Sequence, residues 1–170
     1  LSSLLLDADV IINLHAHEVW EAFLAKNTIC VGSIVVAESP RYKNAKTGQY
    51  FPIQYDSRVT ILHGNVNEIQ RIRNCFCPIN GPEIHPGELE EIVILRERHN
   101  DGLKFCTCDR GAIQAMAMLG LEASGISFEE ALTKSNLKIP LTKKSWTKAE
   151  YQKLVELGSK NRVLGLRSMP

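Results

Sequence analysis

Four acidic residues stand far apart in the chain, and each follows a short apolar or turn-forming segment. They are Asp7 after the apolar run at 4–6, Glu38 after that at 34–37, Glu88 after Pro86-Gly87, and Asp109 after residues 105–108. In an α/β fold, acids at the ends of such segments converge at the carboxyl edge of the sheet, where ligands bind. Carboxylate oxygens suit Mg²⁺ or Mn²⁺, which can support phosphoryl-transfer chemistry. The pattern predicts one cation site assembled from distant sequence.

Each acid also has an ordinary structural interpretation. Glu38 fits a charge at a helix end, and Glu88 fits a first-turn acid that the helix dipole favours. Glu91 lies three residues after Glu88 on the same helix face and is a reserve candidate, whereas Glu90 points elsewhere and is expected to be solvated. The site prediction therefore depends on the four acids taken together.

Strands that alternate with helices must position these acids. Apolar runs predict strands at 4–6, 28–31, 104–108 and 120–124. Helical periodicity predicts two helices within 10–26 that meet near 15–17, and helices at 33–38, 66–76, 87–98, 110–119, 128–134 and 146–160. Ser127 and Ser145 are the expected N-caps of the last two helices. This alternation predicts an α/β fold, a three-layer sandwich around a central, mainly parallel sheet.

Two segments stand apart from this alternation. Residues 41–60 interleave basic and aromatic side chains and predict a projecting loop or hairpin, which could bind nucleic acid or cover the body or a dimer partner. The net charge is +1, but residues 1–133 hold 11 basic and 17 acidic residues, whereas 134–170 hold 9 basic and 2 acidic. A basic tail beside an acidic body suggests that the tail binds a polyanion that the body processes. Equally, the basic residues could lie on a solvated helix face.

Taken in order, the motifs resemble those of the PIN-domain nucleases. The resemblance rests on residues 4–14, Ile34 to Glu38, Pro86-Gly87-Glu88 with Ile92 to Leu95, and Thr107 to Arg110 before an Ala-rich helix. The Gly-Glu form of the third motif is similar to a bacterial and archaeal subgroup. The resemblance covers about residues 4–135, which implies a PIN-like nuclease domain at 1–135 and a basic C-terminal helical extension at 136–170.

This resemblance implies a divalent-metal-dependent endoribonuclease that hydrolyses single-stranded RNA, as toxin-type members do. Asp7, Glu38, Glu88 and Asp109 match the family's acidic positions as catalytic and metal-binding residues, with Mg²⁺ or Mn²⁺ as the cofactor. Thr107 matches a hydroxyl position, while Asp9 replaces the Ser, Thr or Asn of many members; Asp9, Thr107 and Glu91 are supporting candidates. An antitoxin and a homodimer are the partners that such a protein would have.

Basic residues are the candidates for contacting the RNA. Those nearest the motifs, in the projecting segment and in the extension are Arg41, Lys43, Lys46, Arg110, Lys143 and Lys144. Trp146, Tyr151, Leu154 and Val155 recur at helical spacing and are expected to form a packing face rather than a platform for bases.

Parts of the sequence also fit two other classes of protein. A catalytically silent PIN-fold module would bind RNA or protein without cleavage. Asp7-Ala8-Asp9-Val10 after an apolar strand also resembles the first motif of haloacid-dehalogenase-type phosphatases, in which Asp7 would be the nucleophile. That class needs a downstream pair of acids, but the region of Asp109 supplies one.

Cysteine, histidine and hydropathy patterns add weaker expectations. Five spread cysteines fit a reducing cytoplasm, and Cys75, Cys77, Cys106 and Cys108 are spaced too closely within each pair for a usual zinc site. The five histidines have no metal-ligand spacing and are expected to be structural or superficial. No apolar run reaches the roughly 18 residues that span a bilayer, so no membrane association is expected.

Overall fold

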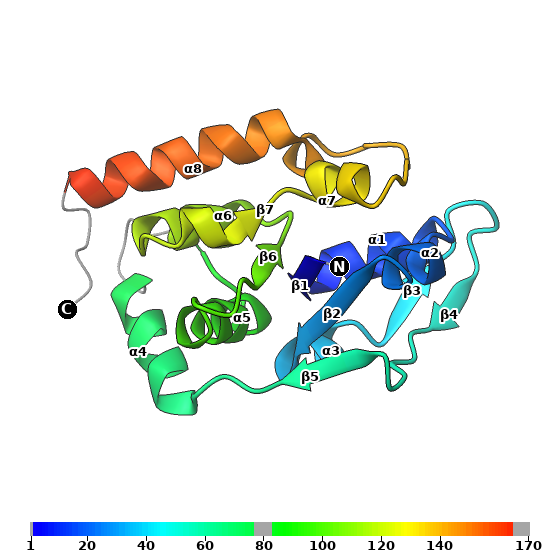
Figure 1. Cartoon of the computed structure of the whole chain (residues 1–170), viewed down its shortest axis with the longest axis horizontal. Coiled ribbons are helices and arrows are strands. Elements are labelled where there is room, and N and C mark those ends of the chain that lie inside the picture. Colours follow the sequence, from blue (N-terminus) through cyan, green and yellow to red (C-terminus); the bar gives the residue numbers. More distant parts are fainter. Residues whose placement is uncertain (1, 77–82, 165–170) are drawn as a thin grey trace.

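A central parallel sheet organises the chain. The computed structural model describes residues 2–76 and 83–164. The strands of the sheet are β1 (Ser2–Leu6), β2 (Asn27–Gly32), β5 (Val59–Leu62), β6 (Lys104–Cys106) and β7 (Gly125–Ile126). They lie in the order β5-β2-β1-β6-β7, and every neighbouring pair is parallel. Helices cover both faces (Figure 1), so the predicted three-layer α/β sandwich is confirmed.

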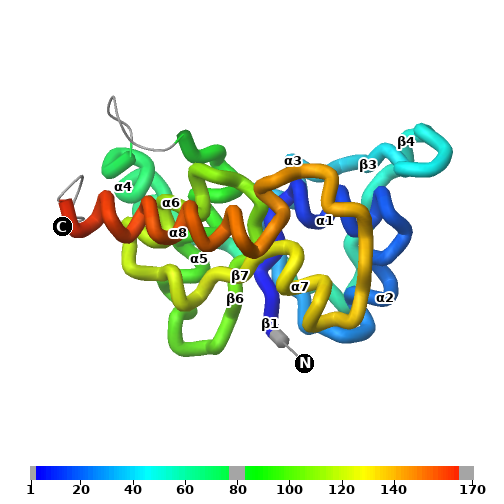
Figure 2. The backbone as a smooth tube through the Cα atoms, turned by 90° about the horizontal axis from the view of Figure 1, so that it is seen from above, coloured from blue at the N-terminus to red at the C-terminus, as the bar shows by residue number. Residues whose placement is uncertain are grey.

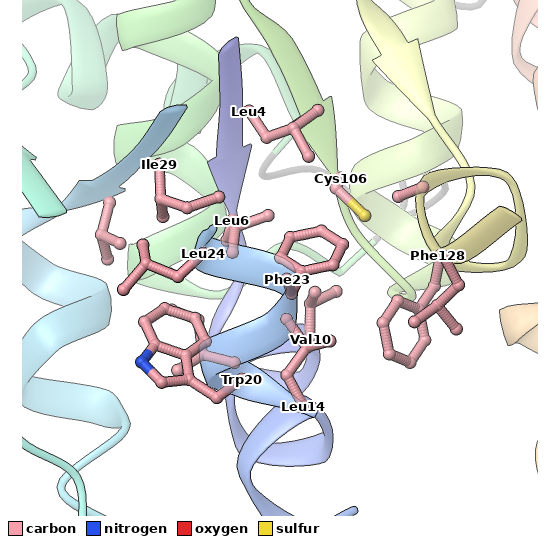
Figure 3. Packing of buried hydrophobic residues seen from close by; sticks show 14 of the residues in the cluster. Leu4, Leu6, Val10, Leu14, Trp20, Phe23, Leu24, Ile29, Cys106 and Phe128 are labelled. Carbon is pink, nitrogen blue, oxygen red and sulfur yellow. The ribbon is translucent and has the colours of Figure 1, made fainter. Parts of the chain in front are cut away.

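The residues of β1 alternate between the two faces of the sheet and so between two cores. Leu4 and Leu6 belong to one buried cluster, and Leu5 to the other. On the Leu4 and Leu6 side lie α1 (Ala8–Ala16), α2 (Trp20–Leu24) and α7 (Phe128–Lys134). Figure 3 shows Val10, Leu14, Trp20, Phe23, Leu24 and Phe128 gathered around these two leucines. Because both faces of β1 are buried, its sequence is a continuous apolar run rather than an alternating one.

The opposite face is covered by α4 (Val66–Phe76), α5 (Pro86–Glu97) and α6 (Arg110–Met118). The middle helix, α5, is buried from Gly87 to Leu95 and has no solvated face along that stretch. Its acids therefore lie inside the protein, although an isolated amphipathic helix would expose them. This burial follows from the run Ile92 to Leu95, which an amphipathic surface helix would not carry.

Two smaller features sit beside the sheet at its carboxyl edge. The short helix α3 (Ser33–Glu38) follows β2 directly, and Val35 anchors it in the Leu4 and Leu6 core. The antiparallel ribbon of β3 (Arg41–Lys43) and β4 (Tyr50–Pro52) then projects from the body. The expected hairpin is present, but the segment assigned to it also contains the start of β5, an edge strand that the sequence prediction missed.

The C-terminal part differs from its prediction at several positions. Residues 120–124 were expected to form a strand, but Glu122–Ser124 is a 3₁₀ turn and the strand is Gly125–Ile126. A second 3₁₀ turn occupies Lys144–Trp146, and α8 (Lys148–Val163) starts later than expected. Thr147, rather than Ser145, is its N-cap and accepts a hydrogen bond from the Glu150 amide; the Ser127 cap of α7 is confirmed.

The C-terminal residues from 136 onward pack closely on the rest of the protein. Trp146 is buried and meets Phe128 edge to face at 5.6 Å, and Tyr151 and Leu154 enter the core beneath α6 and α8. The expected packing face is thus confirmed for these three residues. Residues 165–170 of the extension lie outside the described residues. No helix in the described ranges is long and apolar enough to cross a membrane.

Gly158 tests how α8 docks on α6. In an open helix, Gly→Ala stabilises by about 0.5–1 kcal/mol. Here a Cβ at 158 would lie 2.5 Å from the backbone oxygen of Gln114 and 2.7 Å from Cβ of Ala117. We therefore expect Gly158→Ala to lower the unfolding free energy by roughly 1–3 kcal/mol in urea titrations. Glu156→Ala, exposed on the same helix, is the control, and a Gly158→Ala protein as stable as wild type would contradict this packing.

Candidate active site

An acidic cavity of about 270 Å³ opens at the carboxyl edge of the sheet. It is lined by Asp7, Ala8, Asp9, Glu38, His85, Glu88 and Asp109. The strand order reverses between β1 and β6, since the chain proceeds to β2 and β5 on one side and later to β6 and β7 on the other. Such switch points leave a crevice in open α/β sheets. The structure thus brings together the four acids that the sequence analysis singled out.

Asp7 is aimed at the cavity rather than at the helix that follows it. It occupies the N-cap position of α1, where an Asp side chain usually accepts a hydrogen bond from the first turn, yet it makes no such cap. Instead its Oδ2 accepts a hydrogen bond from Thr107 Oγ1 at 2.8 Å, and Thr107 Oγ1 accepts one from the Asp109 amide at 3.0 Å. The buried hydroxyl of Thr107 therefore couples the acids that follow β1 and β6.

Asp109 combines a structural contact with its place in the cavity. It is the N-cap of α6, and its Oδ1 accepts a hydrogen bond from the Ala112 amide at 2.9 Å. Gly111, in the first turn of this helix, has no room for a side chain, because a Cβ there would overlap the backbone oxygen of Glu83. The segment before α5 consequently lies directly against the start of α6.

Glu88 is fixed by the residues just before it. It lies in the first turn of α5, and its Oε2 accepts a hydrogen bond from the His85 backbone amide at 2.8 Å. Pro86 begins the helix, a position that needs no backbone donor. His85 lines the cavity as well, a role that the sequence analysis missed. Its position three residues before Glu88, at the N-cap of α5, was the available signal.

Glu38 reaches the cavity from the last residue of α3. Its Oε1 accepts a hydrogen bond from the Gly87 amide at 3.3 Å. A side chain at position 87 would overlap Oε2 of Glu38, so only glycine allows the two helices to approach this closely. The Gly87-Glu88 pair thus does two things: Gly87 admits Glu38, and Glu88 supplies its own carboxyl group.

Burial and mutual repulsion determine the protonation of these acids. Burial, together with repulsion from Asp109, Asp7 and Glu38, raises the pKa of Glu88 to about 9. Burial raises the pKa of Asp7 to about 6, against the hydrogen bond from Thr107 and with added repulsion from Asp9 and Asp109. Without a cation, Glu88 therefore holds a proton at neutral pH. A bound cation would remove the repulsion and release that proton.

Glu91 is wholly buried behind the cavity and does not line it. Neither of its carboxyl oxygens has a hydrogen-bond partner, although the nearby Gly32 amide slightly favours the charged form. Burial raises the pKa of Glu91 well above its usual range, and repulsion from Asp7 and Glu88 adds to this. It is therefore a neutral acid next to the site rather than a wall residue.

Glu90 is buried, so its expected exposure was wrong. Its Oε1 accepts hydrogen bonds from Ser33 Oγ at 2.6 Å and from the Gly64 amide at 3.3 Å, and its Oε2 accepts one from the Ile34 amide at 2.7 Å. It thereby ties α5 to the start of α3 and to the residues after β5. Glu38 and Gly87 make the second tie between α3 and α5, at the other end of α3.

Most of the basic residues expected to contact nucleic acid already have acidic partners. Lys143 pairs with Asp9 at the cavity rim at 3.5 Å, Arg110 and Lys144 both pair with Glu150, and Lys46 pairs with Glu18. Arg41 and Lys43 instead lie over the ring of Tyr50 on the hairpin. The cavity rim therefore carries one cation from the C-terminal extension, at Asp9.

The zinc interpretation finds no support in the described residues. Cys106 and Cys108 are buried in the Leu4 and Leu6 core as small apolar side chains, and Cys77 lies outside the described residues. Burial lowers the pKa of His15 to about 4, and its ring stacks on Trp20 and Tyr42, which fits a structural histidine. Within residues 2–76 and 83–164, no three His, Cys, Asp or Glu side chains are already placed to hold a metal ion.

The donor set nevertheless fits a hard divalent cation. All side-chain donors in the cavity except His85 are carboxyl groups, and Mg²⁺ commonly takes one or two carboxylates while keeping several waters. Comparison with protein-family models, with curated proteins and with solved structures gives no match for this chain.

Glu90→Gln tests the tie between α3 and α5. An amide in place of the carboxyl group sets an N–H against a backbone or hydroxyl donor, so we expect a loss of roughly 1–3 kcal/mol of unfolding free energy. Hydrogen exchange of the Ile34 and Val35 amides should become faster. Glu97→Gln, at the exposed end of the same helix, is the control; equal stability of the two variants would show that Glu90 makes no such tie.

Glu88 should make the metal-free protein less stable as the pH rises. Its pKa of about 9 in the folded state lies above the ordinary value, so the folded protein binds the extra proton between about pH 4.5 and 9. The unfolding free energy should therefore fall across this window, by roughly 1–3 kcal/mol. Glu88→Gln should flatten the decline in denaturant titrations, whereas Glu156→Gln should not; an unchanged slope in Glu88→Gln would exclude Glu88 as its source.

Proposed function

We propose that this chain is a PIN-type, divalent-metal-dependent endoribonuclease that hydrolyses phosphodiester bonds in single-stranded RNA. The observation that carries the proposal is the convergence of Asp7, Glu38, Glu88 and Asp109, from four distant segments, on one cavity at the switch point of a parallel sheet. A group of carboxyl groups that repel one another, with Glu88 neutral in the absence of a cation, is costly to assemble unless a cation binds.

In this proposal Asp7 and Asp109 are direct ligands of Mg²⁺ or Mn²⁺, and Glu38 and Glu88 bind directly or through waters. Such an ion lowers the pKa of a bound water and neutralises charge on the phosphate. The chain's own residues orient the ligands: Thr107 fixes Asp7 and the Asp109 backbone, and the His85 amide fixes Glu88. Asp9 supports the site electrostatically, because it adds negative charge near Asp7. Glu91 is the buried, neutral acid behind the cavity.

The resemblance to PIN nucleases supplies the substrate class and the partners of the proposal. Single-stranded RNA is the substrate, and an antitoxin protein and a second copy of the chain are the partners to test by co-purification and sedimentation. A cytoplasmic location belongs to the same proposal, supported by the five spread cysteines. The phosphatase alternative is weaker, because Asp109 is the one acid that the region after β6 contributes to the cavity.

A second candidate is a catalytically silent PIN-fold module that binds RNA or protein. The observation that favours it is that no three ligand side chains of the described residues are already placed to hold a metal. The two candidates differ in whether a cation draws the carboxyl groups together. Measuring Mn²⁺ binding by electron paramagnetic resonance, with and without RNA, separates that question from turnover.

Asp7→Asn should abolish cleavage, because it removes one carboxylate charge and leaves the shape of the cavity unchanged. With a fluorophore- and quencher-labelled single-stranded RNA and Mn²⁺ or Mg²⁺, we expect the rate to fall by roughly 10²–10³-fold or more. Mn²⁺ affinity should fall with it. Asp101→Asn, on an exposed turn, is the matched control.

Two outcomes would contradict the assignment in different ways. Metal-dependent cleavage that survives Asp7→Asn in a clean preparation would remove Asp7 from the mechanism. Salt-sensitive RNA binding by the wild-type chain, with no cleavage under any divalent ion, would favour the silent binding module.

A further inference from the structure

The hairpin of β3 and β4 has two faces of different chemistry. Tyr42 pairs with Phe51 across the ribbon, Lys43 with Tyr50, and Arg41 with Pro52. Side chains alternate between faces along a strand, so Tyr42 and Phe51 share one face. Arg41, Lys43 and Tyr50 share the other.

The Tyr42 face is committed to the protein itself. Tyr42 stacks on His15 of α1 at 5.2 Å between ring centroids and on Phe51 at 5.6 Å. The tip is also tied to the body, because the Ala45 amide donates to the Ala16 oxygen at 2.9 Å and Asn44 Nδ2 donates to Glu18 at 3.0 Å. The ribbon is therefore held at a fixed angle, and one of its aromatic residues does cover the body.

The Arg41 face remains exposed. Tyr50 is 65% exposed, the largest value among the exposed aromatic residues of the described chain. The Arg41 guanidinium carbon lies 5.4 Å from the centroid of the Tyr50 ring and Lys43 Nζ lies 5.9 Å from it. Neither cation has an acidic side chain within ion-pair distance among the described residues. The face thus combines an accessible aromatic ring with two uncompensated positive charges.

This combination suits a single-stranded nucleic acid better than a protein. Bases stack on exposed aromatic rings, and adjacent cations bind the phosphates that link them. Protein interfaces are enriched in Arg and Tyr but depleted of Lys, so Lys43 beside the Tyr50 ring favours a phosphate-bearing partner. The larger cavity behind the hairpin, about 490 Å³, is a poor site for a polyanion, because its charged lining residues are Glu21 and Asp56, acids that pair with Arg58, and no Lys or Arg lines it.

The hairpin also lies next to the acidic cavity. Arg41 follows Glu38 by three residues, which span at most roughly 11 Å of extended chain. In Figure 2, where the amino end of β1 lies at the bottom, the hairpin runs with α3 along the upper edge of the molecule, on the carboxyl side of the sheet. A strand gripped by this face would thus enter the cavity past Glu38.

We propose that Arg41, Lys43 and Tyr50 form a binding surface for single-stranded RNA that holds the nucleotides flanking the cleaved bond. This surface deepens the proposed nuclease function and rests on it for its substrate. Tyr50 stacks a base, and Arg41 and Lys43 contact its neighbouring phosphates. The surface recognises no sequence by hydrogen bonds to base edges.

The test uses the full chain with Asp7→Asn, so that RNA binds without being cut. Fluorescence anisotropy would follow a labelled oligouridylate of about 12 nucleotides and a duplex of equal length. Tyr50→Ala should raise the Kd for the single strand roughly 5- to 100-fold, and Tyr50→Phe should restore most of the affinity, because stacking needs the ring. Binding of the duplex should change less, since its bases are already stacked.

Charge removal gives an independent measurement. Arg41→Gln with Lys43→Gln should lower the slope of log Kd against log salt by about 1.4, the value for two phosphate contacts on a single strand. Arg73→Gln, on exposed α4 at the other end of the molecule, is the control for general electrostatics. Because the side chains of Arg41, Lys43, Tyr50 and Arg73 lie on the surface, circular dichroism and thermal unfolding should show these variants as folded as their Asp7→Asn parent.

The outcomes separate this surface from the nuclease proposal. If the chain with native Asp7 never cleaves RNA, but Tyr50→Ala weakens RNA binding, the surface stands and the nuclease proposal is removed. If chains with native Asp7 cleave RNA and the hairpin substitutions leave kcat/KM unchanged, the surface is overturned but the nuclease proposal stands. The surface is also overturned if the Asp7→Asn parent does not bind single-stranded RNA. The same holds if Arg73→Gln weakens RNA binding as much as the hairpin substitutions do, or if the hairpin substitutions abolish self-association of the chain instead of RNA binding.

Discussion

Parallel alignment of β1 with β6 is the constraint on which the whole candidate site depends. Leu6 pairs with Cys106, and the Asp7 amide continues the ladder by donating to the Cys106 oxygen at 3.2 Å. This register delivers Asp7, Thr107 and Asp109 to the same edge of the sheet, close enough for Thr107 to contact both acids. A shift of one residue would turn Leu4 and Leu6 out of their core, so hydrophobic burial and the geometry of the acids fix the register together.

The helix α5 then sets what the remaining acids can do. Three of its glutamates lie in one buried stretch, but each meets a different environment: Glu88 faces the cavity, Glu90 accepts hydrogen bonds from α3 and from the residues after β5, and neither carboxyl oxygen of Glu91 has a hydrogen-bond partner. An uncompensated buried carboxyl group is costly, and only Glu90 is fully satisfied by neutral donors. Burial and charge repulsion at Glu88 therefore carry an electrostatic cost that a bound cation would reduce. Glu90 meanwhile holds α3 against α5 through its hydrogen bonds.

The sequence revealed the sheet and the convergence of acids because both depend on local signals. Short apolar runs that end in an acid, with helical periods between them, determine a parallel sheet and the edge at which its acids collect. The prediction failed where the deciding contact comes from elsewhere in the chain. The sequence predicts a solvated Glu90, because the burial of residues 87–95 of α5 depends on tertiary packing. The sequence gives His85 no partner, because the packing of α5 on the sheet is what brings it to the cavity. The edge strand β5 is a short run within a polar, aromatic segment, and Gly120 to Ser124 looked like a strand although the paired residues are Gly125 and Ile126.

The division of charge along the sequence also acquires a different meaning in three dimensions. The basic extension suggested a tail that binds a polyanion, but Lys143 pairs with Asp9 of the body, and Lys144 and the body's Arg110 both pair with Glu150 in α8. Trp146, Tyr151 and Leu154 hold the extension by packing. Exposed ion pairs of this kind contribute little to stability and exchange readily, so Lys143 can leave Asp9 for a phosphate at small cost. Of the six basic residues expected to contact nucleic acid, the two without an ion pair among the described residues, Arg41 and Lys43, lie instead on the hairpin that follows Glu38. In the proposed function, these cations would attract a polyanion to the two rims of the cavity and the carboxylates of its floor would repel it, so a phosphate would need a bound divalent cation to reach Asp7 and Asp109.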